Sequence, residues 1–276
     1  MVELLGAGEI RSLAAELDLR PTKKLGQNFV IDPNTIRKIV AAAQLSPTDK
    51  VVEIGPGLGS LTLGLLEKVD QLIAIEFDQK LATRLASTLK LKAPEKSCQI
   101  VHADAMNVTQ LDFEPDALVA NLPYNISVPV ILHFLESFPS ISKVLVLVQA
   151  EVAARLVAGP GSKTYGSPSA KLAWYGKASA AGVVSRSIFW PVPNVDSALV
   201  YFEKRSTPLP TSLRTEVFRV IDGAFAQRRK TLRQALSGWA GSPDQAEQML
   251  VNAGVSPQAR GEDLRIDDFI EVAKQK

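Results

Sequence analysis

VVEIGPGLGSLT, residues 51–62, carries the clearest fold signal in the sequence. It begins as an apolar strand, passes through a glycine-rich turn, and continues as the predicted helix SLTLGLLEKV at 60–69. This order of elements is typical of a doubly wound α/β sheet, in which ligands bind beyond the carboxyl ends of the strands. The stretch therefore predicts the fold class and also the region in which a binding site should lie.

Apolar runs alternate with helical patterns along the rest of the chain. Besides the strand at 50–55, strands are predicted at 71–78, 98–105, 116–122 and 143–149. Because these runs are apolar on both faces and separated by helices, they indicate a parallel sheet covered on both sides. Segments 182–190 and 197–205 predict a closing antiparallel pair. We therefore expect a doubly wound, mostly parallel seven-stranded, Rossmann-like sheet.

The two ends of the chain are predicted to be helical. A short helix is expected at 10–19, and Asp32 and Pro33 are suited to cap and open a second helix over 34–45. Pro208 and Pro210 mark a linker, after which helices are predicted at 215–236, 243–254 and 266–275. We expect one α/β domain over residues 1–205 and a small helical domain over 206–276.

Composition excludes several classes of protein. The 276 residues are 46% apolar and 22% charged, which is enough to bury a substantial core. One cysteine, Cys98, excludes a disulfide framework, and two histidines, His102 and His133, disfavour a histidine metal centre. We expect core or surface packing for these three residues and no bound metal. The sequence shows neither a signal peptide nor a stretch that could span a membrane, so a soluble, cytoplasmic protein is expected.

The glycine turn and two acids after the next strands predict the ligand. Gly55, Gly57 and Gly59 are spaced G-x-G-x-G, so the third glycine of the dinucleotide fingerprint is missing, and the turn has no P-loop lysine. Glu76 ends the next strand, where a carboxylate can accept hydrogen bonds from both ribose hydroxyls. Asp104 follows the third strand and can meet an adenine amine. These strand ends predict an adenosine-containing ligand without a pyrophosphate, which favours S-adenosylmethionine.

NLPYNIS (121–127) ends the fourth predicted strand beside this ligand. The side-chain carbonyl of Asn121 can accept a hydrogen bond from an exocyclic amine, and Pro123 fixes the backbone so that the Leu122 carbonyl can accept another. Tyr124 offers a flat face on which a base can stack. The segment is therefore suited to hold an adenine N6 amine in line with a methyl sulfonium.

Positive charge is concentrated in one region although the net charge is only +2. Between 204 and 233 the chain carries eight Lys or Arg residues and two acids. Such a concentration is what a polyanion-binding surface needs. The candidates for contact with such a polyanion are Arg228, Arg229, Lys230 and Arg233, expected on successive turns of one helix, and more weakly Lys23 and Lys24.

Seven motifs together resemble the bacterial small-subunit ribosomal RNA adenine dimethyltransferases, the KsgA/RsmA family. They are GQNF (26–29), EIGPGLGSLT (53–62), NLPYNIS, PGSKTYG (160–166), FWPVPNVDS (189–197), RRKTLR (228–233) and the RGEDL segment (260–264). The resemblance implies dimethylation at N6 of two adjacent adenosines near the 3′ end of 16S rRNA, with S-adenosylmethionine as donor, on an assembling small subunit. It also implies that Gln27, Asn28 and Phe29 close over the cofactor together with Gly55, Gly57, Glu76, Asp104 and Asn121, and that Phe189 stacks on the target base opposite Tyr124.

Other functions remain open at this point. A nicotinamide oxidoreductase would need the missing third glycine, and a DNA adenine methyltransferase usually carries a further recognition domain. A large-subunit rRNA methyltransferase of the macrolide-resistance type shares the architecture, and an RNA-binding assembly factor with incidental catalysis is a further alternative. Nothing in the sequence demands a dimer, and we expect a monomer.

Overall fold

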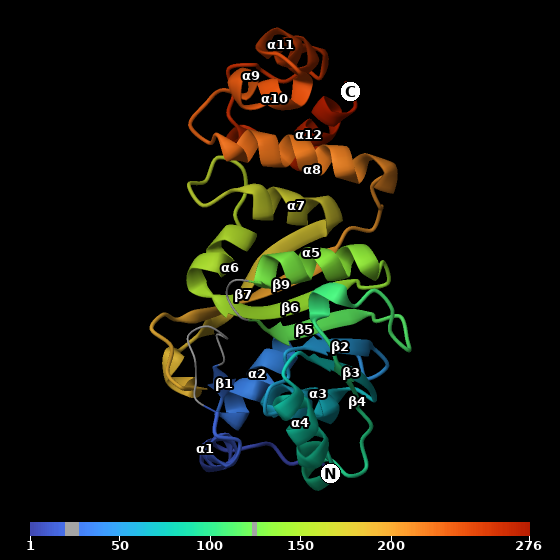
Figure 1. Cartoon of the computed structure of the whole chain (residues 1–276), viewed down its shortest axis with the longest axis vertical. Helices are drawn as coiled ribbons and strands as arrows, with labels where there is room; N and C mark the ends of the chain where they lie inside the picture. Colours follow the sequence, from blue (N-terminus) through green and yellow to red (C-terminus); the bar gives the residue numbers. More distant parts are fainter. Residues whose placement is uncertain (20–27, 123–125) are drawn as a thin grey trace. The chain divides into compact units, whose positions relative to one another are not determined.

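The computed structural model describes residues 1–19, 28–122 and 126–276 and contains a seven-stranded sheet (Figure 1). The strand order is β4–β3–β2–β5–β6–β9–β7. The strands are β2 (Lys50–Ile54), β3 (Gln71–Glu76), β4 (Gln99–His102), β5 (Ala117–Asn121), β6 (Lys143–Gln149), β7 (Gly176–Val184) and β9 (Ser197–Lys204). A separate two-stranded sheet pairs β1 (Phe29–Val30) with β8 (Phe189–Trp190).

Strand order reverses at β2. This strand pairs in parallel with β3 on one side and with β5 on the other. The chain runs outward through β3 and β4, then returns to build β5 and β6 on the opposite side of β2. β9 closes the sheet against β6 in antiparallel register, from Lys143↔Glu203 to Gln149↔Ser197. The predicted doubly wound, mostly parallel fold is confirmed, and its switch point lies at the carboxyl end of β2.

Helices cover the sheet. They are α1 (Ala7–Glu16), α2 (Pro33–Ala42), α3 (Ser60–Lys68), α4 (Gln79–Lys92), α5 (Ser127–Ser137) and α6 (Ala150–Leu156). Asp32 caps α2 as expected, because its carboxylate accepts from the Thr35 amide at 2.9 Å. Alternate strand residues, such as Val51 and Val119, join the core formed with α1 to α4. Their neighbours on the other face are buried too, which explains the uniformly apolar strands.

The predicted closing pair is only partly right. Residues 182–184 belong to β7, next to β9, but the strand begins at Gly176. Its start was missed because GKASAA is half-exposed at a sheet edge and lacks an apolar pattern. Residues 186–188 form a 3₁₀ turn, after which β8 leaves the large sheet and pairs with β1. The predicted strand 182–190 is therefore divided between two sheets.

The described chain forms two compact units, Met1–Ala153 with Ser179–Lys204, and Ala154–Ala178 with Arg205–Lys276. The domain boundary expected near residue 205 coincides with one point at which the chain passes from the first unit to the second, between Lys204 and Arg205. Residues 154–178, assigned from the sequence to the first domain, pack with the second unit. The second unit contains the helices α7 (Ser167–Tyr175), α8 (Thr211–Ala226), α9 (Leu232–Ala235), α10 (Ser237–Ala240), α11 (Pro243–Asn252) and α12 (Ile266–Ala273). Among the described residues, no helix is long and apolar enough to cross a membrane.

The continuous helix predicted over 215–236 is wrong. α8 ends at Ala226, a turn follows over 227–231, and α9 begins at Leu232. The break has a tertiary cause, because the amide of Leu232 donates to the Ala259 carbonyl at 2.8 Å instead of to the preceding helical turn. Helical propensity depends on neighbouring residues and not on this long-range bond, so the helix predicted from the sequence is too long.

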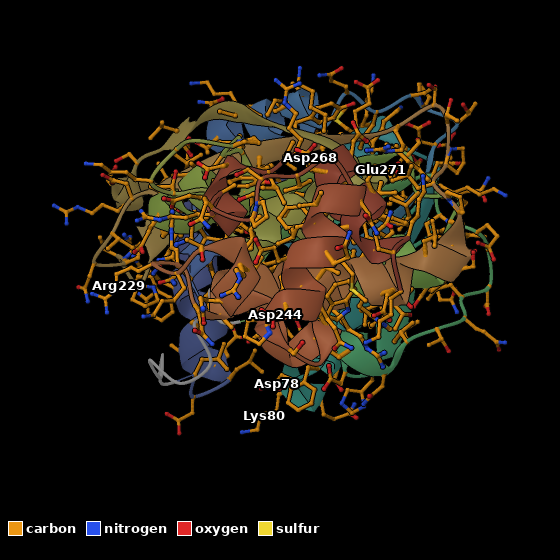
Figure 2. All side chains as sticks on the ribbon, turned by 90° about the horizontal axis from the view of Figure 1, so that it is seen from above. Asp78, Lys80, Arg229, Asp244, Asp268 and Glu271 are labelled. Carbon is orange, nitrogen blue, oxygen red and sulfur yellow. The ribbon has the colours of Figure 1, made fainter. Side chains whose placement is uncertain are left out.

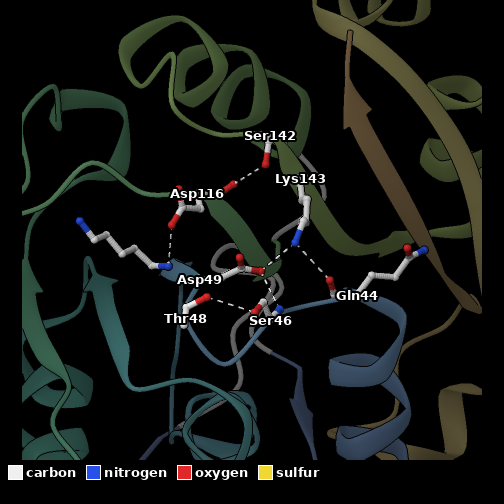
Figure 3. A network of polar contacts seen from close by, with 8 residues as sticks. Gln44, Ser46, Thr48, Asp49, Asp116, Ser142 and Lys143 are labelled. Atoms are coloured by element: carbon white, nitrogen blue, oxygen red, sulfur yellow. Dashed lines mark hydrogen bonds and ion pairs between the residues drawn. The ribbon is translucent and has the colours of Figure 1, made fainter. Parts of the chain in front are cut away.

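A polar network fastens the strand starts at the end of the sheet opposite the switch point (Figure 3). The Lys143 ammonium binds Asp49 Oδ2 at 2.8 Å and the Gln44 carbonyl at 3.3 Å. The Lys50 amide donates to Asp116 Oδ2 at 2.9 Å. Because these contacts join the starts of β2, β5 and β6, they fix the relative register of the three strands that reach the switch point.

Replacing Asp49 with asparagine is expected to cost on the order of 1 kcal/mol at pH 7. Burial would raise the pKa of Asp49, but hydrogen bonds from Lys143 and the Ser46 amide outweigh it and lower the pKa. The folded protein therefore gains stability from this group above its ordinary pKa and loses it as the pH falls through the lowered value. Urea unfolding at pH 7 and pH 3 measures the difference.

Asp70→Asn is the matched control, since Asp70 pairs with Lys96 at 2.6 Å on the exposed surface. A much smaller change is expected there. Equal losses in the two variants would show that the half-buried network contributes nothing beyond a surface ion pair.

Candidate functional site

A cavity of about 390 Å³ opens beyond the carboxyl ends of the parallel strands. Its walls are the segments that follow four of them, namely 55–58 after β2, 76–78 at the end of β3, 103–106 after β4 and 121–122 at the end of β5. Asn28, Phe29, Val30 and Phe189 supply a further wall. The topology brings these segments together because parallel strands end at one edge of the sheet.

The glycine loop needs its glycines for geometric reasons. Gly55, Gly57 and Gly59 have φ values of 69°, 58° and 96°, a region that side chains disfavour. A Cβ on Gly57 would lie 2.9 Å from Phe29 Cε1, and one on Gly59 would lie 2.7 Å from Leu85 Cδ1. The loop therefore packs tightly against β1 and α4, and its residues 55–58 line the cavity.

Glu76 is buried at the end of β3 and already holds two backbone amides. One carboxylate oxygen accepts from the Gly57 amide at 3.0 Å and the other from the Asp78 amide at 2.9 Å. Burial raises the pKa of Glu76 above its ordinary value, although these amides oppose the rise. Since each carboxylate oxygen can accept two hydrogen bonds, both retain capacity for a hydroxyl on a ligand.

Glu53 is a cavity-lining residue that the sequence reasoning missed. It lies within β2, is 1% exposed, and neither carboxylate oxygen has a hydrogen-bond partner among the described residues. Burial raises the pKa of Glu53 to about 8. The Glu76 carboxyl also raises this pKa, whereas the nearby Thr62 hydroxyl, which lies outside hydrogen-bonding geometry, lowers it. An acid in an apolar strand, two residues before the glycine turn, was the available signal.

Asp104 and two apolar side chains form the outer rim of the cavity. Asp104 is exposed and its carboxylate accepts from the Met106 amide at 2.9 Å, which caps the short helix η1 (Ala105–Asn107). Phe77 and Met106 line the same cavity while remaining 66% and 38% exposed. Large apolar groups exposed at a cavity rim are suited to cover a flat ligand. The sequence reasoning overlooked both, although each directly follows a strand-end segment.

Asn121 ends β5 and is half-buried at the cavity wall. Its side-chain amide donates to the Asn28 carbonyl at 3.0 Å. Leu122 is buried, and its amide donates to the Leu147 carbonyl at 3.1 Å, so the backbone is anchored to β6 immediately after Asn121. The other two residues proposed for this corner, Pro123 and Tyr124, lie outside the described residues.

Phe29 and Phe189 are brought to the cavity by the small sheet of β1 and β8. Phe29 pairs with Trp190 and Val30 with Phe189. The rings of Phe29 and Trp190 stack, with centroids 6.4 Å apart and planes 18° apart. Phe189 is only 2% exposed, so a ligand can reach its ring only from inside the cavity. Gln27, predicted beside Asn28, lies outside the described residues.

The predicted cluster of phosphate-binding cations does not share one helix face. Arg228, Arg229 and Lys230 lie in the turn between α8 and α9, and Arg233 lies in α9. Arg228 pairs with Glu262 at 2.9 Å and donates to the Lys163 carbonyl, and Arg233 pairs with Asp244 and Glu247. These two arginines fasten the second unit internally.

Arg229 and Lys230 are exposed and have no side-chain partner within the described part of the chain (Arg229 is labelled in Figure 2). They are the members of the predicted cluster that remain available to a ligand. Lys23 and Lys24, the second predicted pair, lie outside the described residues.

The two histidines make local contacts. His133 Nε2 lies 2.8 Å from the Val108 carbonyl, and its ring packs edge-on against Phe134. His102 Nε2 lies 3.1 Å from the Phe77 carbonyl. Both contacts fit the packing roles expected from the sequence.

Comparison with known proteins places the chain in a family. A sequence model described as ribosomal RNA adenine dimethylase matches residues 19–276. The chain is 57% identical to ribosomal RNA small subunit methyltransferase A of Streptomyces coelicolor, over 99% of this chain and 97% of that protein. It is 56% identical to the protein of the same name from Thermobifida fusca, over 99% and 96%.

Solved structures agree on the fold. A dimethyladenosine transferase from Plasmodium falciparum superimposes with a TM-score of 0.74 at 23% identity, covering 87% of this chain and 94% of that one. The 23S rRNA methyltransferase ErmE superimposes with a TM-score of 0.67 at 27% identity, covering 90% and 99%. The resemblance found in the sequence motifs is thus confirmed over nearly the whole length: the chain belongs to the ribosomal RNA adenine dimethylase family.

Proposed function

We propose that this chain transfers methyl groups from S-adenosylmethionine to N6 of two adjacent adenosines near the 3′ end of 16S rRNA, during assembly of the small ribosomal subunit. The observation that carries the proposal is Asn121, placed by β5 at the wall of a strand-end cavity that also contains the glycine loop and Glu76. The relatives at 56–57% identity, both named small-subunit methyltransferases, support the 16S substrate.

The cavity fits S-adenosylmethionine. A Cβ on Gly55 would meet only the Asn121 carbonyl oxygen, at 3.9 Å, so the missing side chain leaves space between the loop and Asn121. The donor carries an ammonium group and ribose hydroxyls, which can donate hydrogen bonds, and the two buried carboxyl groups of Glu53 and Glu76 have oxygens that can accept them. We assign Glu76 to the ribose, Asp104 to the adenine amine, and Asn28, Phe29, Gly55 and Gly57 to the remaining enclosure.

The residues around Asn121 can activate an amine without a strong base. When bound, S-adenosylmethionine supplies an electrophilic methyl group on a positively charged sulfur. The Asn121 side-chain oxygen and the Leu122 carbonyl would accept the two N6 hydrogens, which favours the pyramidal, more nucleophilic nitrogen in the transition state. Holding the amine in line contributes further, because positioning alone can remove several kcal/mol of a barrier.

The target adenine must leave its stack before N6 can reach Asn121. Phe189 provides an aromatic wall inside the cavity, and Tyr124 is our proposed partner on the other face of the base. Such a sandwich offsets part of the cost of unstacking.

We propose that RNA contact falls to the second unit, in which residues 154–178 join the helical part after residue 205, while the first unit holds the donor and the target base. Arg229 and Lys230 are the exposed cations of the α8–α9 turn, and exposed Lys163 joins the same loop cluster because its carbonyl binds Arg228. Lys23 and Lys24 remain secondary candidates. A monomer acting in the cytoplasm, where ribosomal subunits are assembled, completes the proposal.

Charge reversal in the α8–α9 turn tests the RNA surface. The double variant Arg229→Glu, Lys230→Glu should weaken RNA binding and reduce the slope of log K against log salt by roughly 0.7 to 0.9 per lost phosphate contact. Fluorescence titration of the full chain between roughly 50 and 200 mM salt measures both quantities.

Arg233→Gln is the control, because Arg233 is committed to Asp244 and Glu247. It should lower the free energy of unfolding while leaving the salt slope unchanged. An unaltered slope in the double variant would refute phosphate contact by the turn.

The substrate is tested by incubating the chain with tritium-labelled methyl donor and, separately, naked 16S rRNA, 23S rRNA, DNA and immature small subunits. Label should enter immature small subunits, and nucleoside mass spectrometry should find N6,N6-dimethyladenosine at two adjacent positions. Label only in 23S rRNA would support the macrolide-resistance alternative, whose architecture this chain shares. RNA binding without label would support an assembly factor.

A further inference from the structure

The Asn121 side chain is held in one orientation by a group 93 residues away. Its Nδ2 donates to the main-chain carbonyl of Asn28 at 3.0 Å. A carbonyl has no hydrogen to give, so only the NH₂ end of the amide can face it. The acceptor Oδ1 is therefore the end left for a ligand, and it has no donor among the described residues.

The Asn28 carbonyl is itself fixed by the small sheet that follows it. β1 pairs with β8, and the Ile31 amide extends the pairing by donating to the Ile188 carbonyl at 2.9 Å. The Phe29 ring stacks with Trp190 and also lies close to the bare backbone of Gly57. These contacts leave the carbonyl little freedom, so the direction of the Asn121 amide is set by how β1 docks.

This arrangement requires two different ends on the side chain at position 121. One end must donate to Asn28 and the other must accept from the ligand. An asparagine amide meets both requirements. An ionised aspartate has nearly the same shape but only acceptors, so one of its oxygens would face the Asn28 carbonyl oxygen with no hydrogen between them.

We propose that the Asn28 main-chain carbonyl is a positioning group, which turns the Asn121 amide so that its oxygen receives the substrate amine. The inference rests on the proposed function, in which Asn121 is the amine acceptor. It adds a requirement that acceptor chemistry alone does not impose, namely that the residue at position 121 must also donate. Docking of β1 then becomes a condition for activity as well as for enclosure of the donor.

Asn121→Asp separates this requirement from simple acceptor chemistry through its pH profile. A protonated carboxyl group can donate through its hydroxyl to Asn28 and accept through its carbonyl, whereas the ionised form cannot donate. Single-turnover methyl transfer to immature small subunits, at saturating donor, should be measured from pH 5.5 to 8.5 for wild type, Asn121→Asp and Asn121→Ala. We compare the single-turnover rate of Asn121→Asp with that of wild type at each pH. Above the pKa of the introduced carboxyl, this ratio of rates should rise about tenfold for each unit by which the pH is lowered.

Asn121→Ala supplies neither end and should stay inactive at every pH. Glu53 and Glu76 line the same cavity and are present in every variant. Dividing each variant's rate by the wild-type rate at the same pH removes their contribution to the pH dependence. A constant ratio for Asn121→Asp, whether the variant is active or inactive, would overturn the proposal.

A second measurement needs neither RNA nor donor. The free energy of unfolding of Asn121→Asp should fall progressively below that of wild type as the pH rises, because the folded variant retains a proton that the unfolded chain releases. A deficit that does not change with pH would overturn the positioning role. If wild type failed to methylate the subunits, the proposed function would fall, and this measurement would still decide about the Asn28 contact.

Discussion

Asn121→Ala is expected to reduce single-turnover methyl transfer by about 10³-fold, while the affinity for S-adenosylmethionine changes only a few fold. Preorganised groups aimed at charge that develops in the transition state typically contribute 10²–10³ in rate, and alanine also removes the acceptor that aligns the amine. Asn121 lies at the wall of the cavity, on a different strand from Glu76 and on a different segment from Asp104, the two residues that we assign to the nucleoside of the donor. Loss of its side chain should therefore affect turnover far more than donor binding.

The measurement combines a single-turnover assay using labelled donor with calorimetric titration of the donor. Asn34→Ala is the matched control, because Asn34 is exposed on α2, away from the cavity lining. It should leave both quantities unchanged. Turnover by Asn121→Ala at the rate of wild type would remove Asn121 from the chemistry.

Glu53→Gln is expected to change how stability depends on pH. Burial raises the pKa of Glu53 to about 8, and Thr62 and Glu76 act in opposite directions on it. The unfolded chain releases this proton near the ordinary pKa of a glutamate, about 4.3. Between these values the folded protein holds a proton that the unfolded chain has lost, so raising the pH favours unfolding of the wild type.

A glutamine has the shape of a protonated glutamate and does not titrate. Each pKa unit corresponds to about 1.4 kcal/mol, so the wild type should lose on the order of 5 kcal/mol relative to Glu53→Gln from pH 4 to pH 8.5. Urea unfolding of both proteins across this range measures the difference. Glu53→Leu, also unable to titrate, should show the same pH dependence as Glu53→Gln even if its packing lowers stability overall.

Parallel stability curves for wild type and Glu53→Gln would contradict this account. They would mean that Glu53 has an ordinary pKa in the folded protein and that water or a movement of the strand solvates its carboxylate.

The strand-end part of the site was predictable because it depends on local pattern. Gly55 follows an apolar strand, Glu76 and Asn121 each end one, and parallel topology brings these strand ends to one edge. The cap of α2 by Asp32 is equally local. In each case, residues close together in the sequence determine the structure.

What the sequence did not provide depends on contacts between distant segments. The bond from Asn121 to Asn28 joins segments 93 residues apart, and β8 pairs with the distant strand β1 instead of with the large sheet. The break between α8 and α9 likewise depends on the Ala259 carbonyl. Periodicity and propensity describe neighbours along the chain and contain no record of such partners.

The interior position of Glu53 was missed for a related reason. In the sequence, an acidic residue within a strand suggests an interruption of the apolar pattern. The burial of Glu53 is apparent only in the structure, where the sheet and the cavity surround its side chain. The same holds for Arg228 and Arg233, whose acidic partners come from other segments of the second unit.

A crystal structure of the full chain with S-adenosylmethionine tests the central claim most directly. The account predicts a donor in the strand-end cavity, its ribose hydroxyls on Glu76, its adenine beside Asp104, and its methyl group facing Asn121. A donor bound elsewhere, or one whose methyl group points away from Asn121, would contradict it.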